Sequence, residues 1–199
     1  YDFLTFEDGQ LGLVIGDVSG KGIPAALVMA TTQSMLRAAA QTTTSPGEVL
    51  ARVNELLCVD MPPNLFVTCF YAILDPTTGH LRFANAGHDL PYQRHSDEVC
   101  ELRATGMPLG LMSGMCYEEN EATLSPGESI LFYSDGLVEA HNTKREMFGS
   151  PHLKELISGH PGGTPLIDFL LSQLATFTGP DWEQEDDVTM VAVHRDSDA

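Results

Sequence analysis

The stretch GLVIGDVSGKGIPAAL, residues 12–27, joins an apolar segment to a glycine-rich turn and the start of a helix. Residues 11–18, LGLVIGDV, have the length and near-continuous hydrophobicity of a buried strand. Pro24 suits the first turn of a helix that we expect to run to about Gln41. Asp17 ends the strand, although glycine turns at such a junction usually hold a phosphate. The sequence therefore raises the question of why a carboxylate stands there.

The composition limits the classes of protein to consider. The 199 residues can bury one substantial core, so we expect a single domain over residues 1–199. The chain has 10 basic and 28 acidic residues, and this formal net charge of −18 argues against nucleic acid and membrane surfaces as partners. The four cysteines form no CxxC pair and the histidines fit no HExxH pattern. We therefore expect reduced thiols, a cytoplasmic location and no zinc site.

The remaining segments read as hairpin-linked strands and helical pairs. One helix is expected from Ser45, which can act as its cap, with Pro46 in the first turn and Glu48 completing a capping box. Further strands are expected at residues 65–74, 80–87, 98–102, 116–124, 129–134 and 188–193, and further helices at residues 150–158 and 164–177, the last with Thr164 as cap. This order is not the strict alternation of a doubly wound fold, and it predicts an α+β fold with antiparallel sheets.

Acidic residues occur at three places where an expected strand meets a loop. Asp17 ends the first strand, Asp135 follows the strand in LFYSDGLVEA, and Asp186 and Asp187 immediately precede the last strand. Each has an ordinary explanation, because Asp-Gly favours turns, QEDD can be a solvated loop, and Asp17 can cap the following helix. If a compact sheet brings them to one edge, however, the carboxylates repel one another unless a cation lies between them. Oxygen ligands alone select Mg²⁺ or Mn²⁺, so the shared placement favours a metal that in turn holds phosphate.

A nucleotide site is the competing interpretation of the glycine turn. Residues 20–25, GKGIPA, fit the dinucleotide fingerprint, but the acidic residue expected ~20 positions later is missing. GDVSGKG also fails as a P-loop, because the spacing is one residue short and no Ser or Thr follows Lys21. The sequence therefore disfavours nucleotide binding.

Six ordered motifs together carry a family resemblance. They are GLVIGDVSGKGIPAAL, LFVTCFYAILDPTTGHLRFANAGH, GMPLGL, LSPGESILFYSDGLVEAHN, MFG and EDDVTMV. From residue 1 to about residue 194 the chain resembles the PPM-type metal-dependent serine/threonine phosphatases, in particular their bacterial SpoIIE/RsbU-like branch. The resemblance implies a four-layer α-β-β-α sandwich, with two antiparallel sheets between helical pairs and a site for two Mn²⁺ or Mg²⁺ ions.

The resemblance also implies which residues form the site. Asp17, Asp135 and Asp186 correspond to catalytic metal ligands, the backbone carbonyl of Val18 to a further ligand, and Asp187 to the alternative for Asp186. Lys21 is a candidate phosphate-binding residue, and a solvated lysine at a helix start is the alternative. The branch usually carries a GGD motif just ahead of YDF, whose aspartate is a ligand. The given sequence begins at YDF, so we expect weak metal binding or a single metal.

The implied chemistry is hydrolysis by a metal-activated water, without a protein nucleophile. The implied substrate is phosphoserine or phosphothreonine on a small anti-anti-sigma protein of the STAS type. The chain would then be the C-terminal part of a longer regulatory protein, and a homodimer through the upstream region is a further expectation. The alternative is a catalytically inactive phosphatase-like interaction module.

Several residues near the motifs have two explanations. His88 in NAGH is either a proton donor to the leaving oxygen or a structural histidine at the hairpin end, and Asn85 has the same ambiguity. Met107, Met112 and Met115 form either a docking loop or part of the core.

Overall fold

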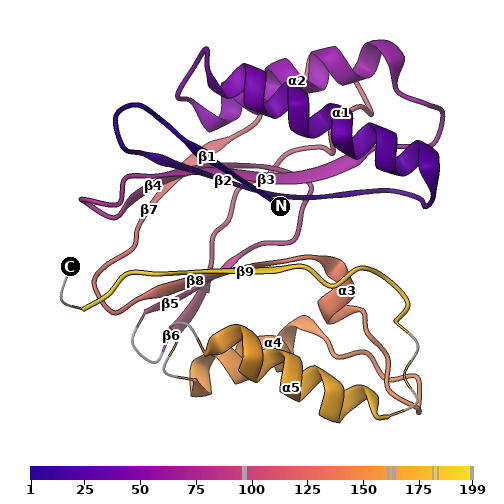
Figure 1. Cartoon of the computed structure of the whole chain (residues 1–199), viewed down its shortest axis with the longest axis vertical. Helices are drawn as coiled ribbons and strands as arrows, with labels where there is room; N and C mark the ends of the chain where they lie inside the picture. Colours follow the sequence, from indigo (N-terminus) through magenta and orange to yellow (C-terminus); the bar gives the residue numbers. More distant parts are fainter. Residues whose placement is uncertain (96–97, 161, 163–164, 181, 183, 198–199) are drawn as a thin grey trace. The chain divides into compact units, whose positions relative to one another are not determined.

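The chain folds into two compact units. The structure, a computed structural model, describes residues 1–95, 98–160, 162, 165–180, 182 and 184–197 (Figure 1). Unit 1 consists of Tyr1–His88 and Arg103–Thr123, and unit 2 of Asp89–Leu102 and Leu124–Ala199. Each unit contains one antiparallel sheet and its own pair of long helices, which confirms the predicted α+β class with antiparallel sheets. That residues 1–199 act as one domain stays a prediction.

Unit 1 is a five-stranded sheet covered by two helices. The strand order is β1 (Asp2–Thr5), β2 (Leu11–Val18), β3 (Val67–Leu74), β4 (His80–Ala86) and β7 (Glu119–Thr123). Helices α1 (Ile23–Ala40) and α2 (Pro46–Asp60) lie over one face of this sheet (Figure 1). The α2 residues Val49, Leu50 and Val53 are fully buried and share a core with strand residues such as Val67 and Tyr71. This core fixes the strands whose ends carry the candidate site.

Helix α2 begins where the sequence predicts, but only half of the capping box forms. The Ser45 hydroxyl accepts a hydrogen bond from the Glu48 backbone N–H at 3.2 Å, and a proline occupies the first turn. The Glu48 carboxylate accepts from the Thr43 hydroxyl at 2.6 Å instead of reaching back to the cap. The Ser45 hydroxyl in turn donates to the Glu119 carboxylate of β7 at 2.6 Å. The cap therefore also ties the helix to the edge of the sheet.

Unit 2 is a four-stranded sheet with its own helices. The strand order is β6 (Glu98–Glu101), β5 (Tyr92–His95), β8 (Ser129–Tyr133) and β9 (Met190–His194). Helices α4 (Ser150–Gly159) and α5 (Leu166–Thr178) pack on this sheet (Figure 1) through a core that includes Leu131, Leu153 and Leu170. The short helix α3 (Asp135–Val138) directly follows β8.

Several predicted boundaries are wrong, and three elements were not predicted. The missed elements are β1, β5 and α3, which are four residues each and too short to show a periodic pattern. Strand β7 begins at Glu119 because its pairing with β4 ends there, opposite Ala84, and β9 is shifted to Met190–His194. Pro165 occupies the cap position of α5, and the predicted cap Thr164 lies outside the described residues.

All four cysteines are free, with Cys69 buried, Cys58 partly buried and the other two exposed. Burial raises the pKa of the Cys69 thiol to about 12, so this thiol stays protonated at neutral pH. Within the described part of the chain, none of the helices has the length and apolar character that a bilayer crossing requires.

Ser45 both caps α2 and donates to Glu119, so its replacement should cause a measurable loss of stability. The Ser45→Ala variant should lower the free energy of unfolding by about 1–2 kcal/mol, because the first turn of α2 loses its cap and Glu119 loses a donor. Thr44→Ala is the matched control, since Thr44 is exposed and precedes the cap. Urea melts monitored by circular dichroism give both values. Equal midpoints for the two variants would contradict the capping role.

Candidate functional site

In unit 1, the turn after β2 is held against β3 by Ser19. Its hydroxyl accepts a hydrogen bond from the Phe66 backbone N–H at 2.8 Å, and its own backbone N–H donates to the Phe66 carbonyl at 2.9 Å. Gly20 and Gly22 then adopt φ values of +97° and +81°, in the left-handed region that favours glycine. These contacts fix the backbone that follows Asp17, which is half-buried near the end of β2.

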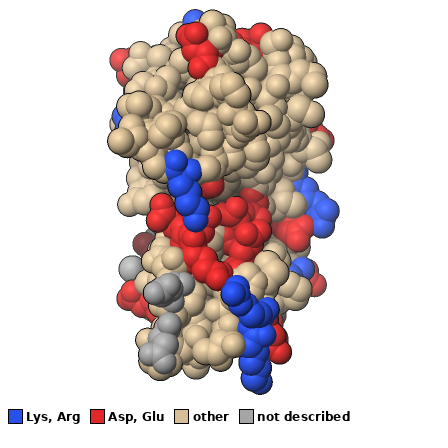
Figure 2. All heavy atoms as spheres, turned by 90° about the vertical axis from the view of Figure 1, so that its right-hand side faces the viewer, with Lys and Arg blue, Asp and Glu red and all other residues tan. Residues whose placement is uncertain are grey.

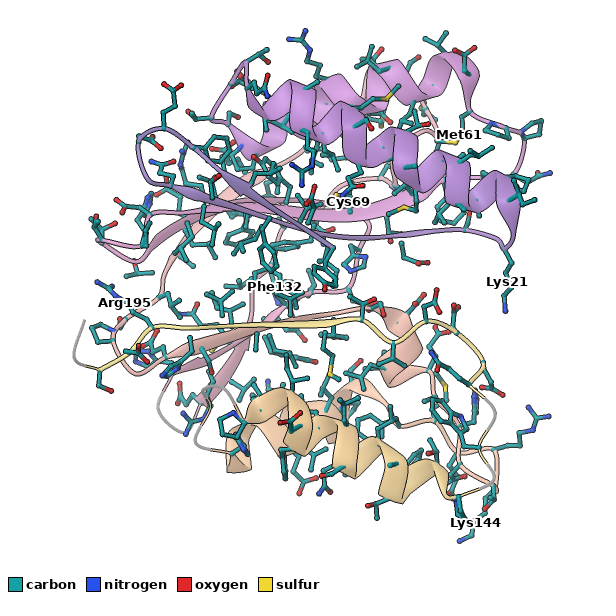
Figure 3. The ribbon with its side chains drawn as sticks, in the orientation of Figure 1. Lys21, Met61, Cys69, Phe132, Lys144 and Arg195 are labelled. Carbon is teal, nitrogen blue, oxygen red and sulfur yellow. The ribbon has the colours of Figure 1, made fainter. Side chains whose placement is uncertain are left out.

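The structure overturns the explanation of Asp17 as a helix cap. The cap position of α1 is Gly22, which makes no side-chain capping bond, and Pro24 lies in the first turn as predicted. Lys21 is exposed, and its side chain extends from the turn away from α1 (Figure 3). Asp17 therefore does not occupy the cap position of α1.

The hairpin end in unit 1 carries a buried polar cluster. Asn85 is 3% exposed and His88 is 6% exposed. The Asn85 amide donates to the His88 carbonyl at 2.9 Å, and the His88 backbone N–H donates to the Asn85 side-chain oxygen at 2.8 Å. The reciprocal bonds give Asn85 a structural role at this hairpin end.

In unit 2, the Ser134 hydroxyl joins two backbone segments by hydrogen bonds, as Ser19 does in unit 1. The Ser134 hydroxyl donates to the Asp187 carbonyl at 3.0 Å and accepts from the Thr189 backbone N–H at 3.0 Å. Gly136 brings the same two segments together, because a Cβ built on it would lie 2.4 Å from the Asp187 carbonyl oxygen. The backbone around Asp135 is thus in contact with the acidic segment that precedes β9.

Asp89 is an acidic residue of unit 2 that the sequence analysis missed. Loss of hydration, together with the charges of Asp135 and Glu139, raises the pKa of its carboxyl group to about 6. Asp89 comes soon after β4, much as Asp17 ends β2, so the same rule of an acid after a strand would have found it. Nearby charges of one sign are the environment that a bound cation relieves.

The donor set of the candidate site consists of oxygen atoms, which is the set that Mg²⁺ and Mn²⁺ prefer. Asp135 is half-buried, whereas Asp186 and Asp187 are exposed, and the Asp186 carboxylate accepts from the Asp187 backbone N–H at 2.8 Å. Within the described residues, no group of three or more His, Cys, Asp or Glu side chains is arranged to hold a metal ion. The convergence of Asp17 with Asp135 and Asp186 therefore stays a prediction.

A small hollow lies beside the acidic segment of unit 2. It has a volume of about 120 Å³ and is lined by Gly136, Glu139, Ala140, His141, Trp182, Glu185 and Asp186. The His141 Nδ1 atom lies 2.8 Å from the Glu185 carboxylate, which orients both side chains. Acidic side chains are exposed in both units on the face drawn in Figure 2. The hollow itself is acidic, because Glu139, Glu185 and Asp186 are among the residues that line it.

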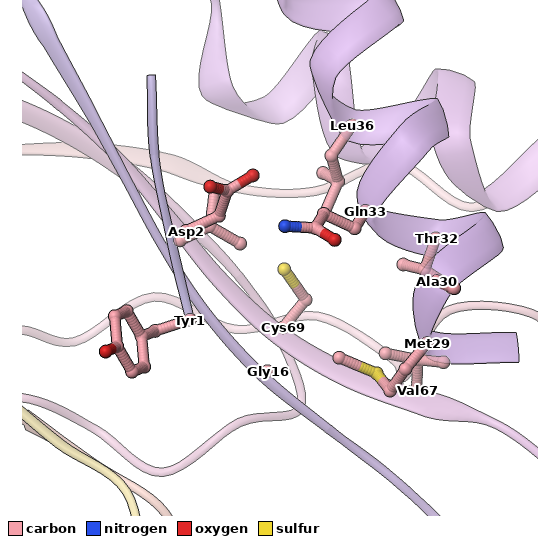
Figure 4. Close-up of a pocket in the computed structure, with 11 residues that line it drawn as sticks. Tyr1, Asp2, Gly16, Met29, Ala30, Thr32, Gln33, Leu36, Val67 and Cys69 are labelled. Carbon is pink, nitrogen blue, oxygen red and sulfur yellow. The ribbon is translucent and has the colours of Figure 1, made fainter. Parts of the chain in front are cut away.

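A larger cavity of about 280 Å³ occurs in unit 1 between α1 and the sheet (Figure 4). Its walls are mainly apolar and include Met29, Leu36, Val67 and Cys69. The polar groups at its edge include Asp2, whose carboxylate accepts from the Arg37 guanidinium at 2.5 Å. None of the predicted metal ligands lines it, so this cavity is separate from the candidate site.

Comparison with known proteins identifies the class. The two antiparallel sheets and their helical pairs match the fold of PPM-type phosphatase domains. The family model of SpoIIE, described as Stage II sporulation protein E, matches residues 7–196, and the chain belongs to this family.

Three relatives show the extent of the similarity. The chain is 28% identical to Protein IcfG of Synechocystis sp., over 98% of this chain and 35% of that protein. It is also 28% identical to the phosphoserine phosphatase RsbU of Bacillus subtilis, over 98% of this chain and 58% of RsbU. The crystal structure of the RsbU and RsbW domains of Rv1364c from Mycobacterium tuberculosis has 30% identity and a TM-score of 0.81, over 98% of this chain and 56% of that one. The chain thus spans only part of the length of each.

The raised pKa of Asp89 predicts how the metal-free protein responds to pH. Below about pH 4 the carboxyl group is protonated in both the folded and the unfolded state, so it costs no stability. As the pH rises through about 6, ionisation is harder in the folded state and the stability falls. We expect Asp89→Asn to remove this fall and to stabilise the metal-free protein at pH 7 by about 1 kcal/mol, allowing for solvent screening.

Thermal melts in EDTA between pH 4 and pH 8 measure this effect. Glu155→Gln, which changes an exposed carboxylate on α4, is the matched control and should follow the parent protein. An Asp89→Asn variant with the same pH profile as the parent would show that the pKa of Asp89 is not raised in the folded state.

Proposed function

We propose that the chain is the catalytic domain of a metal-dependent protein phosphatase that hydrolyses phosphoserine or phosphothreonine. The observation that carries the proposal is the SpoIIE family match over residues 7–196, combined with the acidic residues at the strand ends of both units. A phosphatase-like module without activity is the alternative.

The proposed ligands are atoms of this chain held by short-range contacts. They are the Asp17 carboxylate, the Val18 carbonyl, the Asp135 carboxylate and the Asp186 carboxylate, with Asp187 as the alternative to Asp186. The hydroxyls of Ser19 and Ser134 and the backbone approach at Gly136 hold these positions. Mn²⁺ or Mg²⁺, when bound, supplies the Lewis acidity that activates water toward a phosphate monoester. Lys21, exposed on the glycine turn, is the proposed contact to the phosphate of the substrate.

The proposed substrate is a phosphorylated anti-anti-sigma protein of the STAS type, in the cytoplasm and in the regulation of a sigma factor. Support comes from the similarity to RsbU, which is described as a phosphoserine phosphatase. The net charge of −18 makes nucleic acid and anionic membranes poor partners by comparison with a folded protein. A homodimer formed through an upstream region stays a prediction.

Metal dependence is the first test of this function. The full-length protein should release phosphate from a phosphoserine protein with Mn²⁺ or Mg²⁺ and should stop in EDTA. Asp17→Asn should abolish turnover but leave the metal-free fold as stable as the parent, or more stable by ~1 kcal/mol, because one repelling charge is gone. Mn²⁺ should raise the melting temperature of the parent more than that of the variant.

The control for this test is Asp60→Asn, the same change at an exposed position at the end of α2 in unit 1. It should keep the activity and the metal response of the parent. Full turnover in EDTA would refute metal-dependent hydrolysis. A parent protein that folds but neither responds to Mn²⁺ nor releases phosphate would support the inactive interaction module.

Substrate size is the second test. The chain has only 10 Lys and Arg residues, too few to form an evident Arg-rich cleft for short phosphopeptides. We therefore expect recognition of a folded phosphoprotein, with kcat/KM for the intact partner at least about tenfold above that for a phosphopeptide of the same local sequence. Phosphate release measured on both substrates decides the point, and comparable kcat/KM values would refute this specificity.

A further inference from the structure

The cluster at the end of β4 holds the His88 ring in one place. The reciprocal bonds between Asn85 and His88 fix the backbone of the histidine. Gly87 allows this geometry, because its φ is +71° and a Cβ on it would lie 2.7 Å from Pro108 Cγ. With its backbone fixed and only 6% of its surface exposed, His88 has little freedom to turn.

The His88 ring contacts the neighbour of Asp17. Its Nδ1 atom lies 2.9 Å from the Thr68 hydroxyl oxygen. Thr68 on β3 stands directly opposite Asp17 on β2, and its hydroxyl donates to the Asp17 carbonyl at 3.4 Å, a long bond. A chain of two contacts therefore leads from the His88 ring to the backbone of Asp17.

The single proton of the Thr68 hydroxyl sets the protonation of the ring. If that proton points to the Asp17 carbonyl, the hydroxyl accepts from His88, and the Nδ1 atom must carry a hydrogen. A neutral His88 then has no proton on Nε2, so it cannot donate one from that atom. If the hydroxyl donates to Nδ1 instead, the opposite tautomer results and the bond to Asp17 is lost. The tautomer of His88 thus reports which arrangement exists.

The bond from the Thr68 hydroxyl matters because the Asp17 carbonyl is part of the peptide between Asp17 and Val18. The Ser19 N–H donates to the Phe66 carbonyl, so these two residues form a hydrogen-bonded pair. Hydrogen-bonded pairs recur at every second position of an antiparallel ladder, and Asp17 with Thr68 is therefore the next such pair. A second bond from the Thr68 hydroxyl to the same carbonyl restrains the peptide plane between Asp17 and Val18. Both proposed metal ligands of unit 1, the Asp17 carboxylate and the Val18 carbonyl, are attached to that peptide.

We propose that His88, in the tautomer with hydrogen on Nδ1, is a positioning residue that acts through Thr68 on Asp17. The inference rests on the proposed function, because it assigns His88 to the preparation of the Asp17 metal ligand. It places His88 outside the group of residues that touch the substrate, and it separates this histidine from the role of proton donor. The support is the continuous set of contacts from Asn85 through His88 and Thr68 to Asp17.

The first experiment reads the tautomer without any substitution. Long-range ¹H–¹⁵N correlation spectra of the metal-free, ¹⁵N-labelled protein at about pH 8 distinguish a protonated from an unprotonated ring nitrogen, since the usual histidine pKa is near 6.5. The His88→Asn variant assigns the His88 signals by their absence. We expect Nδ1 protonated and Nε2 unprotonated. Hydrogen on Nε2 would overturn the proposal.

The second experiment measures Mn²⁺ affinity by calorimetry, together with kcat and KM. Thr68→Val keeps the shape of the side chain and removes the hydroxyl, whereas Thr68→Ser keeps the hydroxyl. His88→Asn presents a polar atom where Nδ1 lies, whereas His88→Gln presents one where Nε2 lies. We expect Thr68→Val and His88→Gln to weaken Mn²⁺ binding about tenfold, and Thr68→Ser and His88→Asn to stay within about threefold of the parent.

Thr5→Val is the control, because Thr5 is exposed on β1 of the same unit. Circular dichroism melts in EDTA show whether each variant folds. The tautomer measurement uses no Thr68 variant, so it tests the proposal even if Thr68→Val does not fold. A parent that binds Mn²⁺ while Thr68→Val and His88→Gln bind it equally well would overturn the positioning role alone. A folded parent that binds no Mn²⁺ would overturn the proposed function and this inference with it.

Discussion

The pairing of β2 with β3 is the constraint on which the candidate site in unit 1 depends. At Gly16 the two backbones approach so closely that a Cβ would lie 2.6 Å from the Thr68 carbonyl oxygen. This approach sets Thr68 opposite Asp17 and, one step further, brings Ser19 against Phe66. Because β2 lies between β1 and β3 and leads into α1, a shift in this pairing would displace the strand, the turn and the helix together.

The two units hold their acidic residues by the same means. In each unit, a serine hydroxyl forms a hydrogen bond to a neighbouring backbone segment, and a nearby glycine allows a close backbone approach. The pairs are Ser19 with Gly16 and Ser134 with Gly136. Short polar side chains and glycine give little freedom to the attached carboxylates, which favours preorganised ligands. Loss of hydration and, after it, the charges of Asp135 and Glu139 raise the pKa of Asp89. Under the proposed function, the metal-free fold gives up some stability for affinity toward a cation.

The sequence predicted those features that depend on local patterns. The apolar run of β2, the cap and proline at the start of α2, and the acidic positions Asp17 and Asp135 at strand ends all follow from residues a few positions apart. The missing half of the capping box has a local cause, because the Ser45 backbone N–H donates to the Thr43 hydroxyl at 3.2 Å and not to Glu48. Other features depend on contacts between distant segments, such as the bond from the Ser45 hydroxyl to Glu119 of β7, 74 positions away, which no local pattern announces. The loss of the capping hypothesis for Asp17 has a similar cause, since the turn held by Ser19 places Gly22 at the start of α1.

The spacing of the acidic segments in unit 2 depends on Gly136 having no Cβ atom, because its backbone lies close to the Asp187 carbonyl. Alanine is usually the mildest replacement, yet here its methyl group would meet a carbonyl oxygen that stands 2.4 Å from the position of its Cβ. The change would leave the charge of the protein untouched and still push the two segments apart. A comparison of sequences that scores only acidic residues would overlook this position, although the geometry of the acids depends on it.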